Sequence, residues 1–138
     1  MSETSLQELR KFMTTVVPYW QTLGLELREV APGRAVFEAV VTPGLMQNQV
    51  VHGGVLASIA DSACAVAAIS LVFPESYATT VNLHVSYLKP VTEGRFRAEG
   101  LCLKAGKKVL FSEARVFDHQ ETLVCTASSQ LLALPRKT

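Results

Sequence analysis

Two kinds of hydrophobic pattern alternate along this chain. Apolar residues recur at helical spacing between residues 5 and 14, and a nearly continuous apolar run occupies Val55–Phe73 with Asp61 as its only charge. The first pattern predicts an amphipathic helix, and the second predicts a long buried helix. The long helix is expected to end near Pro74, because proline cannot continue a helix.

Most of the remaining chain alternates apolar and polar residues with a period of two, which is typical of half-buried strands. The segments 23–30 and 35–41 flank the sequence Ala-Pro-Gly-Arg. Proline presets φ and glycine can adopt a left-handed conformation there, so a hairpin is predicted. Four more strands, expected to follow one another as a meander, cover residues 79–88, 96–104, 109–117 and 122–134.

These elements together predict an α+β fold in which about six antiparallel strands wrap around the long helix. Residues 1–138 are expected to form a single domain, with a core at about residues 20–134. The chain is 49% hydrophobic and only 18% charged, against about 25% charged in typical domains. Because the chain is short, unusually apolar and expected to have open sheet edges, we predict that two copies pair edge to edge as a homodimer.

Charge and residue spacing exclude several classes of protein. The formal net charge is +1, which argues against a nucleic-acid partner, because such domains are strongly basic. A membrane span is not expected, because Asp61 near its centre would cost about 2.5–3.5 kcal/mol. The N-terminal segment lacks a secretory signal, so a cytoplasmic protein is expected. The three cysteines and three histidines lack metal-ligand spacing, so no metal, disulfide or cofactor is predicted.

The first candidate for chemistry is the sequence His52-Gly53-Gly54, where the long helix begins. The first N–H groups of a helix lack intrahelical acceptors, and the local potential is positive. Without side chains, Gly53 and Gly54 would let a substrate carbonyl approach these amides closely. The alternative is structural, because a tight corner between a loop and a helix also requires glycine.

The second candidate is Asp61, because carboxylates are rarely buried without a partner. The helix around it offers only serine as a local partner. Asp61 is therefore either a nucleophile or general base facing a cavity or a second chain, or a structural acid satisfied by hydroxyl groups. His52 and Asp61 are nine positions apart, which is about 13.5 Å of helix and opposite faces. Antiparallel long helices in a two-fold dimer would unite the two residues in composite sites.

These residues resemble a known family. A His-Gly-Gly sequence opening a long helix, an acid nine positions after the histidine and the strands that follow are similar to the hotdog-fold acyl-CoA thioesterases, most of all the PaaI-like branch. The resemblance covers about residues 20–134 and implies hydrolysis of an acyl-CoA thioester in a site shared by two subunits. It implies that Asp61 is the nucleophile or the base that activates water. It also implies that the Gly53 N–H polarises the thioester carbonyl, and that His52 holds the carbonyl or orients the loop.

The resemblance suggests further site residues. A polar residue before the histidine binds near the lytic water or the carbonyl in this family, and either Asn48 or Gln47 is expected to fill that role. Thr80 matches a Ser or Thr that supports the catalytic acid, although a β-branched residue is also ordinary in a strand.

The CoA part of the substrate carries phosphates, so a basic surface is expected to bind it. The densest basic cluster lies in one predicted turn and comprises Lys104, Gly106, Lys107 and Lys108. The resemblance implies that this turn contacts CoA and that Tyr87 lies nearby. The alternative is a solvated lysine-rich turn that protects a sheet edge.

Two other functions stay open on the sequence. One is an enoyl-CoA hydratase or dehydratase of the same fold, which uses a His with an Asp or Glu for acid–base chemistry. The other is a non-catalytic acyl-CoA binding module.

A homotetramer built as a dimer of dimers is expected, in an arrangement that the sequence does not indicate. A small acyl or aryl group is expected on the CoA thioester, but the preferred one is left open, with Met46, Val55, Ile59 and Ala63 as expected pocket walls.

Overall fold

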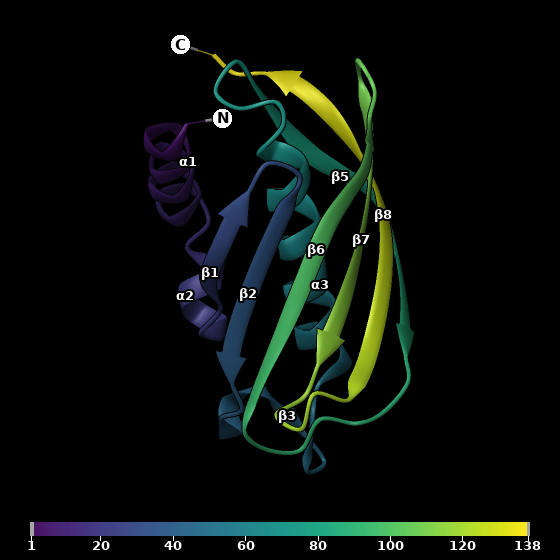
Figure 1. The fold of residues 1–138 in the computed structure, drawn as a ribbon. Helices are drawn as coiled ribbons and strands as arrows, with labels where there is room; N and C mark the ends of the chain where they lie inside the picture. The colour runs from purple at the N-terminus through teal and green to yellow at the C-terminus, as the bar shows by residue number, and fades with distance from the viewer. Residues whose placement is uncertain (1, 138) are drawn as a thin grey trace.

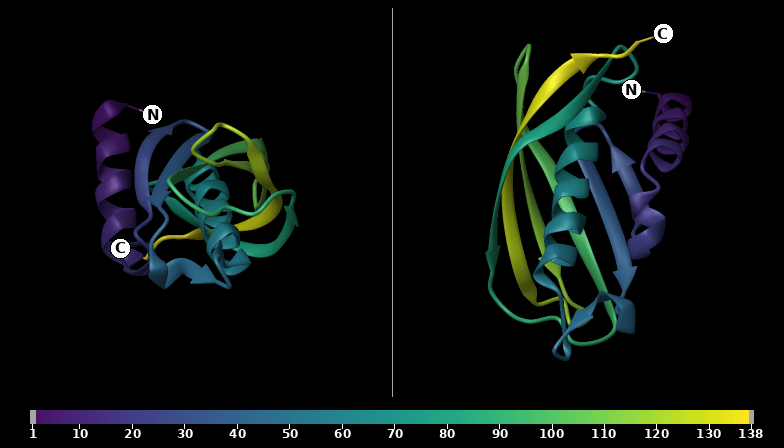
Figure 2. Two further views of the ribbon diagram at one scale, coloured as in Figure 1. Left: turned by 90° about the horizontal axis from the view of Figure 1, so that it is seen from below. Right: turned by 180° about the vertical axis from the view of Figure 1, so that it is seen from behind.

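The computed structural model describes residues 2–137 and shows one curved sheet that wraps around a central helix (Figure 1). All pairings in the sheet are antiparallel, and seen end-on the sheet curls around this helix (Figure 2). The predicted α+β class, the six strands and the long central helix are confirmed. The helices are α1 (Glu3–Val16), α2 (Tyr19–Leu23) and α3 (Gly53–Ile69), and the sheet contains β1 (Glu26–Ala31), β2 (Arg34–Val40), β5 (Ser76–Tyr87), β6 (Arg95–Ala105), β7 (Val109–Phe117) and β8 (Leu123–Pro135).

The N-terminal region is more helical than its sequence pattern predicts. Helix α1 begins after Ser2, whose side chain accepts a hydrogen bond from the Ser5 amide at 3.1 Å. A second short helix, α2, follows Pro18 and ends at Gly24, which has a φ of 74°. The strand expected from residue 23 therefore starts only at Glu26, because the chain is still helical at Leu23.

The long helix also ends earlier than expected, at Ile69 instead of near Pro74. The Ser70 hydroxyl donates to the Ala67 carbonyl at 2.7 Å and accepts from the Gly33 amide at 2.8 Å. Ser70 thus binds the end of α3 to the β1–β2 turn, and the apolar residues after it form turns.

The strand order differs from the expected four-strand meander. Strands β6, β7 and β8 do form a meander, but β5 lies beyond β8 at the edge, and β6 pairs with β2. The connection from β5 to β6 crosses the end of the molecule where α3 begins (Figure 1). The expectation was wrong because the alternation of apolar residues shows which face of a strand is buried but not which strand lies beside it.

Helix α3 packs on the inner face of the sheet through fully buried residues such as Ile59 and Ala63. Gly100 of β6 allows this close approach, because a Cβ there would overlap the Ala63 carbonyl and lie 2.9 Å from the Ala63 Cβ. The opposite side of α3 is only half-buried and faces away from the sheet (Figure 2). Within residues 2–137, no helix combines the length and apolar character needed to cross a membrane.

Candidate active site

A small hairpin precedes α3 and carries the polar residues expected before the histidine. Strands β3 (Met46–Gln47) and β4 (Val50–Val51) pair, and Asn48 and Gln49 form the turn with φ values of 51° and 70°. Two positive φ values in succession are typical of a type I′ turn, in which glycine usually follows asparagine. Gln47 and Asn48 are exposed at this hairpin.

His52 is the N-cap of α3. Its Nδ1 accepts a hydrogen bond from the Gly54 amide at 2.8 Å, so in the neutral ring the proton is on Nε2. A Cβ at Gly54 would lie 2.9 Å from this Nδ1, which explains the second glycine of the motif. The Gly54 amide is therefore occupied within the chain and is not free for a substrate carbonyl, contrary to expectation.

The Gly53 N–H is the amide that remains available at the helix start. Within residues 2–137 it has no hydrogen-bond acceptor, whereas the Gly53 carbonyl accepts from the Tyr87 hydroxyl at 2.7 Å. Partial burial raises the pKa of Tyr87 above its ordinary value of 10.0, so the phenol stays protonated and can donate. A Cβ on Gly53 would lie 3.1 Å from the Tyr87 ring. The absence of a side chain at Gly53 thus lets the Tyr87 ring of β5 lie close to the start of α3.

Asp61 lies on the half-buried side of α3, one residue from Ser62. The Thr80 hydroxyl of β5 donates to its Oδ1 at 2.8 Å. In the part of the chain that the structure describes, no basic side chain lies within 4.0 Å of the Asp61 carboxylate. The structure therefore brings Asp61 and Thr80 together and leaves this carboxylate without a counter-ion.

A cavity of about 270 Å³ opens beside Asp61. Its walls come from the end of α1, from α2, from one face of α3 and from the start of β5. The expected walls Val55, Ile59 and Ala63 lie instead in the core, at most 7% exposed. The cavity is lined by Met13, Val17, Tyr19, Trp20, Ser58, Asp61, Ser62, Ala65, Tyr77, Ala78, Thr79 and Thr80.

The sequence carried a signal for part of this cavity that the prediction did not use. Ser58, Asp61, Ser62 and Ala65 follow the i, i+3, i+4, i+7 spacing of one helix face. These four residues form a small and polar stripe in an otherwise apolar helix. The contributions of α1 and α2 had no such signal, because they depend on where these helices pack.

Two of the three cysteines are poor candidates for chemistry. Burial raises the pKa of the Cys64 thiol to about 12 and that of the Cys125 thiol to about 11, so both are protonated at neutral pH. Among the described residues, no group of three or more His, Cys, Asp or Glu side chains is placed to hold a metal ion.

The lysine-rich turn does not lie near Tyr87 within one chain. Its flanking residue Leu110 is level with Leu131 and Thr80 across the sheet, whereas Tyr87 is level with Val116. Six residues of strand separate these levels, which is roughly 20 Å. The turn therefore lies at the opposite end of the sheet from the start of α3 (Figures 1 and 2), and the expectation that Tyr87 lies nearby is wrong for one chain.

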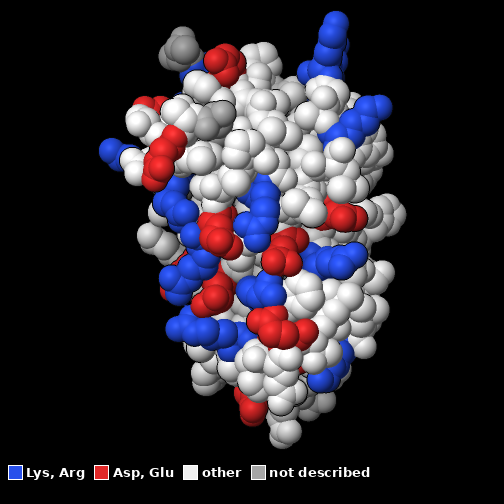
Figure 3. Space-filling view, viewed as in Figure 1, with Lys and Arg blue, Asp and Glu red and all other residues white. Residues whose placement is uncertain are grey.

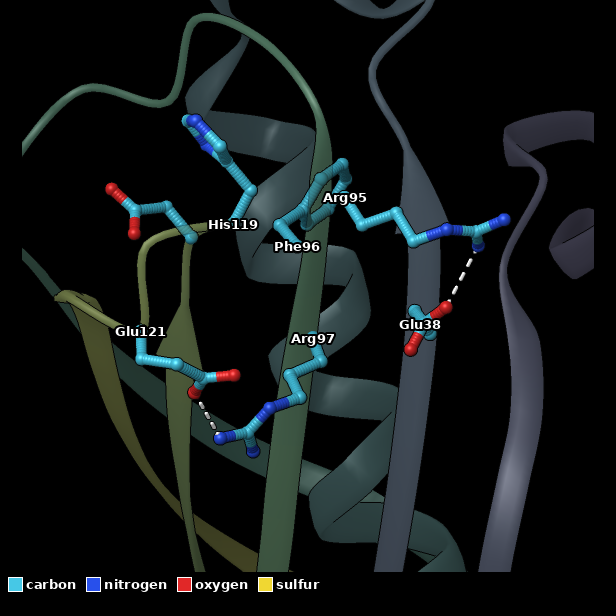
Figure 4. Close-up of a pocket in the computed structure, with 7 residues that line it drawn as sticks. Glu38, Arg95, Phe96, Arg97, His119 and Glu121 are labelled. Atoms are coloured by element: carbon cyan, nitrogen blue, oxygen red, sulfur yellow. Dashed lines mark hydrogen bonds and ion pairs between the residues drawn. The ribbon is translucent and has the colours of Figure 1, made fainter.

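A second hollow, of about 290 Å³, lies on the outer face of the sheet (Figure 4). Here Arg95 pairs with Glu38 at 2.7 Å, and Arg97 pairs with Glu121. These pairs belong to a band of alternating positive and negative residues on this face (Figure 3). Because the charged groups in the hollow already bind one another, it is a weaker candidate for substrate binding than the cavity at Asp61.

Residues 48–125 match the sequence model of the Thioesterase superfamily. The chain belongs to this superfamily. The matched region begins at the β3–β4 hairpin, contains α3 and β5, and ends in β8. This protein has the hotdog fold and is a thioester hydrolase.

Similar proteins are found among both curated sequences and solved structures. The 1,4-dihydroxy-2-naphthoyl-CoA hydrolase of Listeria monocytogenes is 26% identical over 76% of this chain and 86% of its own length. The medium/long-chain acyl-CoA thioesterase YigI of Salmonella typhimurium is 24% identical over 93% of both chains. A thioesterase family protein from Silicibacter pomeroyi is 25% identical with a TM-score of 0.89, over 94% of this chain and 98% of its own. The PaaI protein of E. coli, at 22% identity, shares the fold with a TM-score of 0.88 over 95% and 94%.

Proposed function

We propose that this thioesterase hydrolyses acyl-CoA thioesters, with Asp61 as the nucleophile or general base and the Gly53 N–H polarising the carbonyl. One observation carries the proposal. The Asp61 carboxylate lies on the wall of a cavity, has no basic side chain beside it among the described residues, and accepts a hydrogen bond from the Thr80 hydroxyl at 2.8 Å. A carboxylate with a free oxygen beside an open space can attack a substrate or activate water. The superfamily and the CoA thioesters in the names of two relatives support this substrate class.

Both roles of Asp61 give the same products. As a base, Asp61 takes a proton from water, and the hydroxide attacks the thioester carbonyl carbon. The resulting oxyanion is stabilised by the Gly53 N–H, the C–S bond breaks, and the leaving CoA thiolate takes up a proton. As a nucleophile, Asp61 attacks the carbonyl carbon itself and expels CoA, and water then hydrolyses the mixed anhydride to regenerate Asp61.

We propose further that each site combines Gly53 of one subunit with Asp61 of another. The two residues are eight positions apart on α3, which corresponds to about 12 Å along the helix, too far for both to reach one thioester group. The edge strand β5 and the residue after it expose apolar side chains, with Val81 and Leu88 each 57% exposed. A partner that pairs along β5 would cover them and bring a second α3 beside the first.

The lysine-rich turn enters this proposal only through the assembly. The turn between β6 and β7, with Lys104, Lys107 and Lys108 in or beside it, lies at the opposite end of the sheet from Tyr87 of its own chain, so these lysines would contact a CoA whose thioester is bound at another subunit. A homotetramer would offer such a neighbour, and the turn is then a CoA contact between subunits.

Substitution of Asp61 tests the catalytic role. Asp61→Ala and Asp61→Asn are expected to keep the oligomer and to lower thiol release from acyl-CoA at least about a hundredfold, the usual contribution of a positioned base. Glu38→Gln, which neutralises a carboxylate of the outer face, is the matched control and should keep wild-type turnover.

Full activity of both Asp61 variants would show that another group performs the attack. A change in enoyl-CoA absorbance without thiol release would indicate a hydratase, and acyl-CoA binding without either would indicate a binding module.

Subunit mixing tests the composite site. Gly53→Pro removes the N–H at the first helical position, where proline is tolerated, and Gly53→Ala adds the same Cβ beside Tyr87 but keeps the N–H. Mixed with inactive Asp61→Asn subunits, inactive Gly53→Pro subunits should restore about a quarter of wild-type activity, because half the dimers are hybrids with one intact site. Restoration fails if each subunit holds a complete site. Gly53→Ala should stay more active than Gly53→Pro if the N–H matters.

A further inference from the structure

The N-terminal helices contribute one wall of the cavity that Asp61 lines. Met13 and Val17 come from α1 and the residue that caps it, and Trp20 comes from α2. Met13 is 2% exposed and Trp20 is 6% exposed, so this wall is part of the folded core and not a loose arm. The cavity thus has a carboxylate on one wall and apolar side chains of the N-terminal helices on another.

Two hydrogen bonds hold α2 against the face of α3 that carries Asp61. The Trp20 Nε1–H donates to the Ser62 hydroxyl at 3.0 Å, and the Tyr19 and Ser58 hydroxyls are 2.8 Å apart. Because the Ser58 hydroxyl donates to the carbonyl four residues earlier, Tyr19 is the donor in its pair. Trp20 also packs edge-on against Phe37, with ring centroids 4.8 Å apart. These contacts give the wall a defined position one helical turn or less from Asp61.

The size of the cavity limits the group it can hold. A cavity of about 150 Å³ lined by apolar side chains holds one benzene molecule, so 270 Å³ has room for a substituted ring or an alkyl chain of similar volume. The long pantetheine arm of CoA must reach solvent, whereas Met13 and Trp20 are buried and Val17 is half-buried, so the wall that they form continues into the folded core. The thioester at Asp61 would therefore direct its acyl group into this cavity.

We infer that α1 and α2 form the closed end of the acyl subsite, and that Val17, Trp20 and Ala65 set the largest acyl group accepted. The preferred substrate is then a CoA thioester of a single-ring aryl acid or of a medium-length alkyl acid, and long-chain acyl groups are excluded. This inference rests on the proposed role of Asp61 as the group that attacks the thioester.

The acyl preference of cavity variants tests the inference. Ala65→Leu fills the cavity from α3 with a good helix former, and Val17→Ala enlarges it from the other side. In hydrolysis of acetyl-, hexanoyl-, benzoyl- and palmitoyl-CoA, Ala65→Leu should lower kcat/KM for hexanoyl- and benzoyl-CoA about tenfold or more relative to acetyl-CoA. Val17→Ala should shift the preference towards longer chains. Val16→Ala is the matched control, because Val16 is 45% exposed and lies outside the cavity lining.

Trp20 provides an independent readout, because it is the only tryptophan of the chain. In the Asp61→Asn protein, which should bind without turnover, hexanoyl- and benzoyl-CoA are expected to change the Trp20 emission. Free CoA is the control for absorption by the nucleotide and should leave the emission spectrum unshifted. Ala65→Leu in the same background should weaken the change with benzoyl-CoA.

The outcomes separate this inference from the proposed function. An unchanged acyl profile in both Ala65→Leu and Val17→Ala, with Trp20 emission indifferent to the acyl group, would overturn the inference while the Asp61 variants stay inactive. Rapid hydrolysis of palmitoyl-CoA by the unmutated protein would also overturn it. If the Asp61 variants keep full activity, the proposed function fails first.

Discussion

The outer face of the sheet and the cavity beside α3 treat charged groups differently. On the outer face, Arg97 pairs with Glu99 at 3.0 Å and with Glu121, and Arg34 lies 3.7 Å from Glu99. The inner face packs on α3, and the cavity lies on the side of α3 that faces away from the sheet, where Asp61 supplies the one carboxylate of the lining and has a hydroxyl as its partner. The outer face thus has many charges that neutralise one another, whereas the carboxylate in the cavity has no counter-ion among the described residues.

In a chain with so few charges, a charged group without a counter-ion is a better candidate for chemistry than a group in an ion pair. Exposed ion pairs contribute little to stability, typically about 0–1 kcal/mol, and their charges are occupied. A half-buried carboxylate without a counter-ion is more costly to retain and is free to react. The hollow on the outer face is as large as the cavity at Asp61, so size alone does not distinguish the two.

The largest effect is expected on stability, when the packing on the inner side of β6 is disturbed instead of a charge on its outer side. Gly100→Ala should lower the free energy of unfolding by about 3 kcal/mol or more, because its Cβ would overlap the backbone of Ala63. For a chain of this size that is a fall in Tm of about 10 °C. Glu99→Ala, at the neighbouring outward position, should change stability by less than about 1 kcal/mol. Thermal unfolding of both variants checks the expectation, and equal losses would contradict the division between the two sides.

A smaller effect is expected from the hydroxyl that binds Asp61. Thr80→Val keeps the shape and removes the hydrogen bond at 2.8 Å, and hydrogen bonds to charged groups are worth about 1.5–3 kcal/mol. We therefore expect kcat for acyl-CoA to fall roughly tenfold or more with little change in KM, and Thr80→Ser to recover most of it. Thr126→Val, on the outer side of β8, is the control. Wild-type kcat in Thr80→Val would show that Thr80 is only a strand residue.

The smallest effect concerns Asp118, a carboxylate near the outer hollow that is fully satisfied. The amides of Thr122 and Gln120 donate to Asp118 at 3.0 and 2.9 Å, and these bonds, with Lys89 at 3.6 Å, hold the pKa of its carboxyl below the ordinary 3.8. A lowered pKa stabilises the fold fully above the ordinary value, and this contribution is lost as the pH falls from there through the lowered pKa. Asp118→Asn should thus lower Tm at pH 7 by a few degrees and lower it less near pH 3. An equal effect at both pH values would assign it to packing instead of charge.

The helices and strands of the fold could largely be predicted from the sequence, but not which strands lie side by side. The apolar run around Asp61 indicated a buried helix, and the alternation of residues indicated six strands, because both patterns are local. The place of β5 beside β8 was missed, because any two strands with one apolar face can pair. The short helix α2 and the end of α3 at Ile69 were missed because they depend on contacts such as that between Ser70 and Gly33.

The candidate site divides in the same way. The motif at His52 and the acid at Asp61 stand out in the sequence, and the contact between Asp61 and Thr80 followed from resemblance. The engagement of Gly54 by His52, and of Gly53 by Tyr87, could not be predicted, because each depends on a side-chain orientation.

The class of the fold, the buried helix and the candidate residues for chemistry could all be identified from the sequence alone. Spacing along a chain is enough to show which positions share a face, and a lone acid in an apolar helix needs no structure to be noticed. Only the tertiary structure decided what surrounds that acid. The cavity at Asp61 is made by α1, α2, α3 and β5 together, and the shape of a space enclosed by separate elements depends on how they pack, which no single segment specifies.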